Sequence, residues 1–232
     1  MSERHTSEQR VVILGGHGKI ALLAAPKLTQ AGFAVDSVIR NPDQSGDVEA
    51  AGGTAVVLDI ETAGVQELAD AFSGASAVVF AAGAGGGDPE RTRAVDLDAA
   101  IRAMTAAEHA GVSRFVMVSY AGADMALDGL DADDSFYPYA QAKHDADAHL
   151  RSTGLDFTIL GPGRLTLEPG SGTIQLAHAN GEVDGRELDA EEKVTSRENV
   201  AAVMAHVIAS HAAVRQTVTF YDGGTPIAEA LA

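Results

Sequence analysis

The chain contains no cysteine among its 232 residues, which excludes disulfide bonds and thiolate metal sites. It also lacks a long apolar run, since none approaches the roughly 18 residues of a membrane-spanning helix. The N-terminal segment MSERHTSEQR has no apolar stretch of the kind found in signal peptides. We therefore expect a cytoplasmic protein that is soluble, with residues 1–9 flexible.

Basic residues are scarce: 16 Lys and Arg stand against 33 Asp and Glu, a net charge of −17. This charge repels phosphates and anionic lipid head groups, so neither nucleic acid nor a membrane is expected as a partner. It also repels an anionic cofactor, but salt screens that repulsion beyond about 8 Å. A phosphate site should therefore contain some of the few cations. The acidity itself fits either solubility or a salty habitat.

Apolar runs typical of buried strands alternate with stretches that favour helix. Strands are predicted at 11–15, 34–39, 54–58, 77–82, 114–119 and 155–160, and helices at 18–31, 62–72, 90–110, 139–153 and 197–210. This alternation predicts an α/β fold of the Rossmann type, a doubly wound parallel sheet with helices on both faces. After Leu160 this alternation of strands and helices ends, and short strand-like pieces follow at 173–176 and 218–220. We expect one domain over 1–232, in which 161–232 form a small, irregular, substrate-side portion.

The most informative segment is RVVILGGHGKIA at 10–21, where a β-branched strand runs into glycines and then into a helix. Such a turn points free backbone N–H groups at a dinucleotide pyrophosphate. Cofactor binding is therefore predicted for Gly15, Gly16, His17, Gly18, Lys19 and Ile20. The helix dipole disfavours a cation at Lys19 unless a phosphate binds there, and a solvated lysine is the alternative.

The second predicted strand ends in Arg40-Asn41. An NAD site needs an acidic residue here for the ribose 2′-hydroxyl, whereas arginine suits a 2′-phosphate. Asp36 lies roughly 13 Å back along the strand, towards the wrong end. NADP is therefore preferred, with NAD possible and a surface arginine without a ligand as the alternative.

Two further strand ends offer contacts to a cofactor. Asp59-Ile60 follows the third strand, where the carboxylate could accept from the adenine amine or simply begin a turn. Ala81-Ala82-Gly83 ends the fourth, and such small residues let a cofactor lie against the backbone.

Tyr139 and Lys143 lie one turn apart on a predicted helix, and Ser119 ends the fifth strand. A tyrosine has an ordinary pKa near 10, and a nearby ammonium lowers it. Ser119 could then hold a substrate carbonyl while Tyr139 exchanges its proton. The alternative is an aromatic ring packed on the sheet beside a solvated lysine.

Together these residues resemble the short-chain dehydrogenase/reductase superfamily, in particular its compact atypical members of the NAD-dependent epimerase-like or NAD(P)H-binding kind. The resemblance implies that Lys143 also bonds the nicotinamide ribose and that Gly161, Pro162 and Gly163 flank the nicotinamide. The chain departs from the family at Ala21, where a third glycine is usual, and at Gly161, where arginine is common. Many compact members have lost the tyrosine that is kept here.

No metal site is expected, because His144 and His149, like His206 and His211, are five residues apart and do not share a helix face. The leading hypothesis is an NADP-dependent reductase of a small carbonyl substrate, acting as a monomer or homodimer. An NADP(H)-binding redox sensor without turnover is the alternative. A nucleotide-sugar epimerase ranks last, because only about 70 residues follow Leu160.

Overall fold

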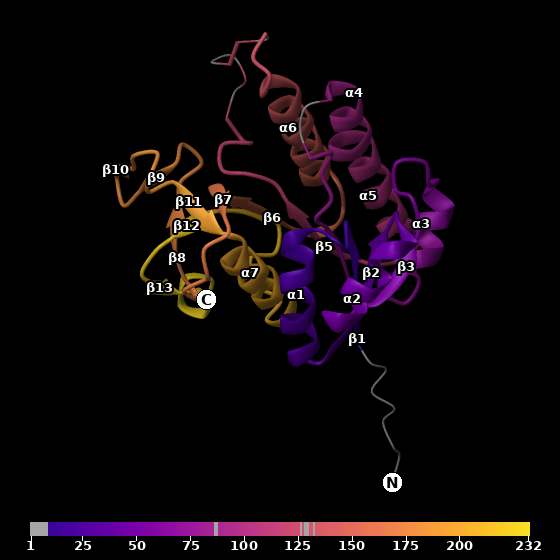
Figure 1. Cartoon of the computed structure of the whole chain (residues 1–232). Helices are drawn as coiled ribbons and strands as arrows, with labels where there is room; N and C mark the ends of the chain where they lie inside the picture. Colours follow the sequence, from indigo (N-terminus) through magenta and orange to yellow (C-terminus); the bar gives the residue numbers. More distant parts are fainter. Residues whose placement is uncertain (1–8, 86–87, 126, 128–129, 132) are drawn as a thin grey trace.

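The computed structural model describes residues 9–85, 88–125, 127, 130–131 and 133–232 (Figure 1). Residues 1–8, which make up most of the segment expected to be flexible, lie outside this description. Residue 9 already belongs to a strand.

In the described part of the chain, one sheet has the spatial order β13-β8-β12-β6-β5-β4-β1-β2-β3. The strands from β3 to β12 are parallel, whereas β8 and β13 are antiparallel to their neighbours. Their bounds are β1 Gln9–Leu14, β2 Phe33–Ile39, β3 Thr54–Val57, β4 Ala77–Phe80, β5 Arg114–Val118, β6 Asp156–Pro162, β8 Thr173–Ala177, β12 Gln216–Asp222 and β13 Thr225–Pro226. The order 3-2-1-4-5-6 confirms the predicted Rossmann-type sheet.

Helices cover both faces of this sheet (Figure 1). The helices are α1 Lys19–Gln30, α2 Ser45–Ala50, α3 Val65–Phe72, α4 Pro89–Thr92, α5 Ala100–His109, α6 Tyr137–Ser152, α7 Arg197–Ala209 and α8 Ile227–Ala230. The pair α1 and α7 packs on one face, and α3, α5 and α6 pack on the other. No described helix is both long and apolar enough to cross a membrane.

The core consists of two apolar layers, and β1 contributes to both. Val11 and Ile13 join the layer beneath α1 and α7, whereas Val12 and Leu14 join the layer beneath α3, α5 and α6. All four are fully buried. Each such side chain stabilises the fold by about 1.5–3 kcal/mol, so a strand covered on both faces needs a continuous apolar run. Ala21, in the place of a third glycine, is also fully buried in the first layer.

The predicted helix at 90–110 is interrupted by a π-helical segment, Arg93–Ala99, between α4 and α5. Asp96 in this segment is buried and accepts a hydrogen bond from the backbone N–H of Ala84 at 3.0 Å. The apolar periodicity of the sequence does not distinguish this π-helical segment from α-helix.

The C-terminal portion is more regular than expected. Besides β8 and β13, β7 (Arg164–Thr166) pairs with β11 (Val194–Ser196), and β9 (Glu182–Val183) pairs with β10 (Arg186–Glu187). Pairing with β12 also extends β6 beyond its predicted end at residue 160, so that Gly161 and Pro162 belong to the strand.

Candidate functional site

The glycine turn after β1 packs closely against two neighbouring strands. Gly15 has φ +81°, and a Cβ there would lie 2.6 Å from Ala82 Cα. A Cβ on Gly16 would lie 2.5 Å from Ser37 Cβ and 2.8 Å from the carbonyl carbon of Ser37. Both contacts are too short for any side chain, so glycine is required at both positions.

This turn leads directly into α1, whose N-terminus has neither a side-chain cap nor an acidic residue in its first turn. The first N–H groups of a helix have no partners within the helix and form a positive end. A phosphate or pyrophosphate is the kind of group that this end can bind.

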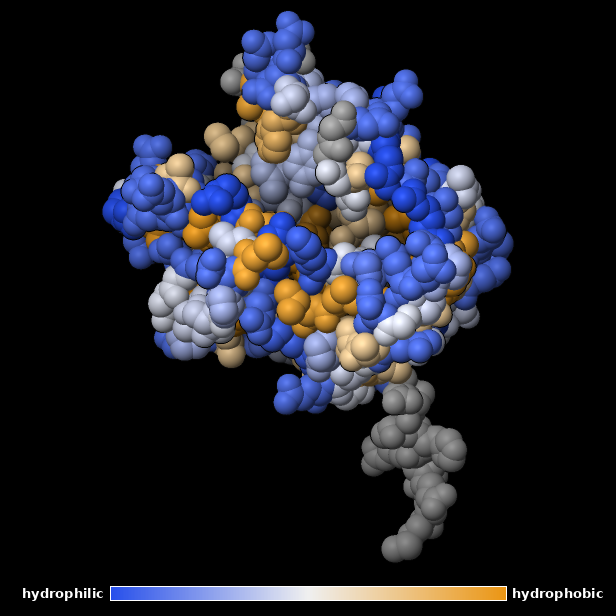
Figure 2. Space-filling view, in the orientation of Figure 1, coloured by the Kyte–Doolittle hydropathy of each residue, from blue (hydrophilic) through white to orange (hydrophobic). Residues whose placement is uncertain are grey.

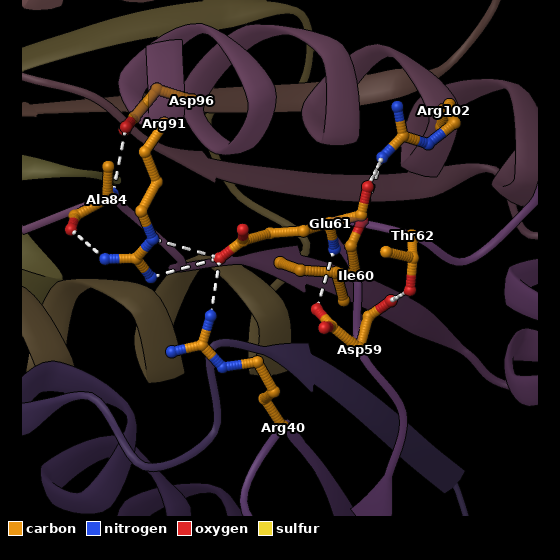
Figure 3. Close-up of polar contacts among 9 residues, drawn as sticks. All are labelled: Arg40, Asp59, Ile60, Glu61, Thr62, Ala84, Arg91, Asp96 and Arg102. Carbon is orange, nitrogen blue, oxygen red and sulfur yellow. Dashed lines mark hydrogen bonds and ion pairs between the residues drawn. The ribbon is translucent and has the colours of Figure 1, made fainter. Parts of the chain in front are cut away.

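A cluster of charges lies where β2 and β3 end (Figure 3). Arg40 Nη1 donates to Glu61 Oε1 at 2.8 Å, and Arg91 donates to the same oxygen through Nε and Nη2, each at 3.1 Å. Arg102 holds the backbone carbonyls of Ile60 and Glu61 at 2.9 and 3.0 Å. Arg40 and Arg91 oppose one carboxylate, so this cluster of three carries a net positive charge in an acidic protein.

The glycine turn and this cluster border one pocket of about 430 Å³. The pocket lies beyond the ends of β1 and β4, at the point where the strand order reverses and where ligands bind in such sheets. Most of the predicted cofactor residues line it: Gly15, Gly16, His17, Gly18, Arg40, Asn41, Asp59, Ile60, Ala81, Ala82 and Gly83.

Two acidic residues near the pocket have other partners. Asp59 accepts a hydrogen bond from the backbone N–H of Glu61 at 3.0 Å, so it forms a turn as well as lining the pocket. Asp36 forms an ion pair with Arg10 and is not among the residues that line the pocket. Arg40, and not Asp36, therefore lies at the end of β2 that borders the pocket.

Lys19 and Ile20 do not line this pocket. Lys19 is exposed and lines a second hollow of about 440 Å³ together with Leu22, Leu23 and Arg197. Figure 2 shows apolar residues gathered over α1 and α7 on this face. A phosphate contact for Lys19 therefore stays a prediction.

The segment Gly161, Pro162 and Gly163 also lies outside the pocket lining. A Cβ on Gly163 would lie 2.6 Å from both the carbonyl oxygen of Lys193 and the ring of Tyr221. Packing within the C-terminal portion thus explains this glycine, and its place beside a nicotinamide stays a prediction.

Ser119 and Lys143 are both buried at the end of β5. Ser119 follows that strand directly, and its Oγ donates to Asp147 Oδ2 at 2.5 Å. Lys143 is 1% exposed, and its Nζ donates to the carbonyl of Val118 at 2.8 Å. For Lys143, the alternative of a solvated side chain is therefore wrong.

Tyr139 lies beside Tyr120 and Phe136, with ring centroids 5.6 and 5.5 Å away. Burial is the main cause that raises its pKa above the ordinary value, and the charges of Asp96, Tyr120 and Asp147 add to this. The expectation that Lys143 lowers this pKa is wrong for the protein alone, because the ammonium bonds the backbone while burial disfavours the phenolate. Tyr139 is protonated at neutral pH.

The sequence model of a family described as NAD(P)H-binding matches residues 15–211. This range includes the glycine turn, the charge cluster and the residues around Tyr139. The chain belongs to the NAD(P)H-binding family.

Several known proteins match the chain over nearly its full length. The Bacillus subtilis protein YhfK, described as an uncharacterised sugar epimerase, is 34% identical and covers 96% of this chain and 98% of its own. A solved structure from Bacillus halodurans, described as a candidate NAD-dependent epimerase/dehydratase, is 31% identical with TM-score 0.81, and the match covers 95% and 97% of the two chains. The oxidoreductase YlbE from Lactococcus lactis is 26% identical with TM-score 0.79, covering 96% and 94%.

Three residues beside the predicted site residues of this NAD(P)H-binding chain were not predicted from the sequence. Glu61 and Arg91 form the charge cluster with Arg40, and Asp147 holds Ser119. Two of them had a usable signal: Glu61 closely follows a strand end, and Asp147 lies one helical turn after Lys143. Arg91 had none, because the fold alone brings the start of α4 to the pocket.

Proposed function

We propose that this protein is an NADP(H)-dependent oxidoreductase that reduces a small carbonyl compound. The observation that carries the proposal is the pocket that joins the glycine turn to the pair Arg40 and Arg91. The end of the pocket at the glycine turn suits the pyrophosphate of the cofactor. The other end presents two guanidiniums against one carboxylate, which suits the extra phosphate of NADP.

A bound nicotinamide cofactor supplies the hydride for such a reaction. The chain's own contribution is the proton, which Tyr139 carries at neutral pH as any phenol does, and burial raises its pKa further. The phenol can give this proton to the alkoxide oxygen that forms as the hydride reaches the carbonyl carbon. Lys143, held in place by the Val118 carbonyl, is the residue that we assign to the nicotinamide ribose.

One observation favours a second candidate, an NADP(H) sensor without turnover. The Ser119 hydroxyl donates to Asp147, and the Lys143 ammonium donates to the carbonyl of Val118. Neither group is hydrogen-bonded to Tyr139. A sugar epimerase, the activity in the description of YhfK, ranks third, because the residues after β6 form no large lobe for a nucleotide sugar.

Titration with NADPH and NADH by nicotinamide fluorescence tests the cofactor, and we expect NADPH to bind at least several-fold more tightly. A screen of small aldehydes, ketones and quinones with NADPH tests turnover. Equal affinities would overturn the assignment of NADP. Tight binding of NADPH without oxidation by any of these compounds would favour the sensor.

A further inference from the structure

Asp147 is a buried acid that the proposed reaction does not yet use. Its carboxyl group is fully buried in α6, one helical turn after Lys143. One oxygen, Oδ2, accepts from Ser119 Oγ at 2.5 Å, and the other, Oδ1, has no partner in the described structure. An ionised carboxylate with a bare oxygen is costly to bury, which makes an ordinary structural role a poor explanation.

The groups that face Asp147 come from several elements. Burial raises the pKa of Asp147 to about 6, while Lys143, the hydrogen bond from Ser119, and His144 oppose that rise. Burial raises the pKa of Tyr120, after β5, and of Tyr139, on α6, and the negative charge of Asp147 adds to both rises. Asp96, from the π-helical segment, is influenced by the Lys143 charge and adds to the rise in the pKa of Tyr139. Asp147 thus lies within the group of residues assigned to proton transfer.

We propose that Asp147 is a positioning residue that decides whether Ser119 donates or accepts the hydrogen bond to the substrate. The inference rests on the proposed reductase function. When Asp147 is ionised, the hydroxyl hydrogen of Ser119 points to the carboxylate, and the serine can only accept at the substrate. When Asp147 is protonated, its own O–H donates to Ser119 Oγ, which frees the serine hydrogen for a carbonyl oxygen.

The two states favour different directions of the reaction. A carbonyl substrate offers only an acceptor, so reduction needs the protonated form of Asp147. An alcohol substrate offers an O–H, so oxidation works with the ionised form. Single protonation of one carboxyl therefore selects the substrate's oxidation state without any movement of the backbone.

The test is the pH profile of kcat/KM for carbonyl reduction in the wild type and in Asp147→Asn. In the wild type we expect a fall that approaches tenfold per pH unit above roughly pH 6, as for a single essential acid. The asparagine amide donates to Ser119 at every pH. We therefore expect the profile of Asp147→Asn to change less than about threefold over the same range. Equal slopes in the two proteins would overturn the proposal.

Two control variants separate Asp147 from its neighbours. Asp145→Asn removes an exposed charge on the same helix, and His144→Gln removes the imidazole whose charge acts on Asp147. Both should keep the wild-type fall with pH. Loss of the fall in His144→Gln would assign the ionisation to the histidine and overturn the proposal.

A measurement without turnover covers the case in which Asp147→Asn does not fold. In protein labelled with ¹³C at aspartate carboxyls, one carboxyl should titrate near pH 6, and Ser119→Ala should raise that pKa because the stabilising donor is lost. An unchanged titration in Ser119→Ala would overturn the proposal. A wild type that binds NADPH but reduces no carbonyl would overturn the reductase function and this role together, whereas reduction with equal pH slopes overturns this role alone.

Discussion

Arg40 and Glu61 are 21 positions apart in the sequence, yet their side chains meet at 2.8 Å where β2 and β3 end (Figure 3). The ends of adjacent parallel strands lie at the same edge of a sheet, which brings the two residues together. Arg91 bonds the same carboxylate oxygen of Glu61. The arginine assigned to the cofactor is therefore held in place and only partly neutralised.

Removal of Arg40 should abolish most of the preference for NADPH. A hydrogen bond to a charged group contributes about 1.5–3 kcal/mol, so Arg40→Ala should weaken NADPH binding roughly tenfold or more and leave NADH nearly unchanged. Fluorescence titration measures both affinities. Arg186→Ala is the matched control, because Arg186 also forms an exposed 2.8 Å pair with a glutamate, outside the pocket lining. A preference that survives in Arg40→Ala would contradict the role of this residue.

Removal of Glu61 should have the opposite effect. Glu61→Gln leaves Arg40 and Arg91 without their shared carboxylate, so NADPH should bind more tightly at low salt and lose affinity more steeply as salt is added. In the wild type, moderate salt should weaken binding only slightly, because screening of the acidic background offsets screening of the local cations. Titrations at several salt concentrations measure this, with Glu192→Gln as the control. A steep loss of NADPH affinity with salt in the wild type would contradict this balance between the acidic background and the local cations.

Gly16 should be intolerant of a methyl group. In Gly16→Ala the new Cβ would lie 2.5 Å from Ser37 Cβ, so the turn or β2 must shift. We expect a loss of about 1–3 kcal/mol in the free energy of unfolding, as for other overpacked sites, and weaker NADPH binding. Gly46→Ala is the control, since that glycine lies in α2 with nothing within 4 Å of a new Cβ, and should be neutral or stabilising. Urea unfolding of both variants decides the matter.

Tyr139→Phe separates an enzyme from a sensor. The ring still packs against Tyr120 and Phe136, so NADPH affinity should hardly change. Turnover should fall by about 10²–10⁴, the usual effect of a positioned acid. Tyr137→Phe, the same change two residues earlier on α6, should have little effect on either quantity. Carbonyl reduction at the wild-type rate by Tyr139→Phe would exclude the tyrosine as proton donor.

Asp147 should make the stability of the protein depend on pH. Its pKa is raised from 3.8 to about 6 by burial, so the folded state holds the proton more tightly than the unfolded chain does. The stabilising effect is complete below about pH 4 and is lost as pH rises through 6, a change of up to about 3 kcal/mol. The free energy of unfolding of Asp147→Asn relative to the wild type should therefore rise over this interval. Asp145→Asn should show no such rise.

The local sequence pattern was sufficient to predict the parallel sheet and most of the residues that line the pocket. Apolar runs such as 11–14 alternate with helical stretches, and such runs are buried only where helices cover both faces of a sheet. The glycines at 15, 16 and 18 stand directly between a strand and a helix, so their role follows from neighbours in the sequence. The same holds for Arg40, since a strand end can be read from the residues before it.

The partners of the functional side chains depended on tertiary structure alone. Glu61 reaches Arg40 across adjacent strands, and Asp147 meets Ser119 only where α6 packs against the end of β5. The pKa of Tyr139 went in the direction opposite to that expected from Lys143, because desolvation is a property of the packed interior and has no sequence pattern. The sequence by itself determined the layers of the fold and most of the residues that line the pocket. Only the packing of those layers decided which charges are buried, what they bond, and hence which protons are available for chemistry.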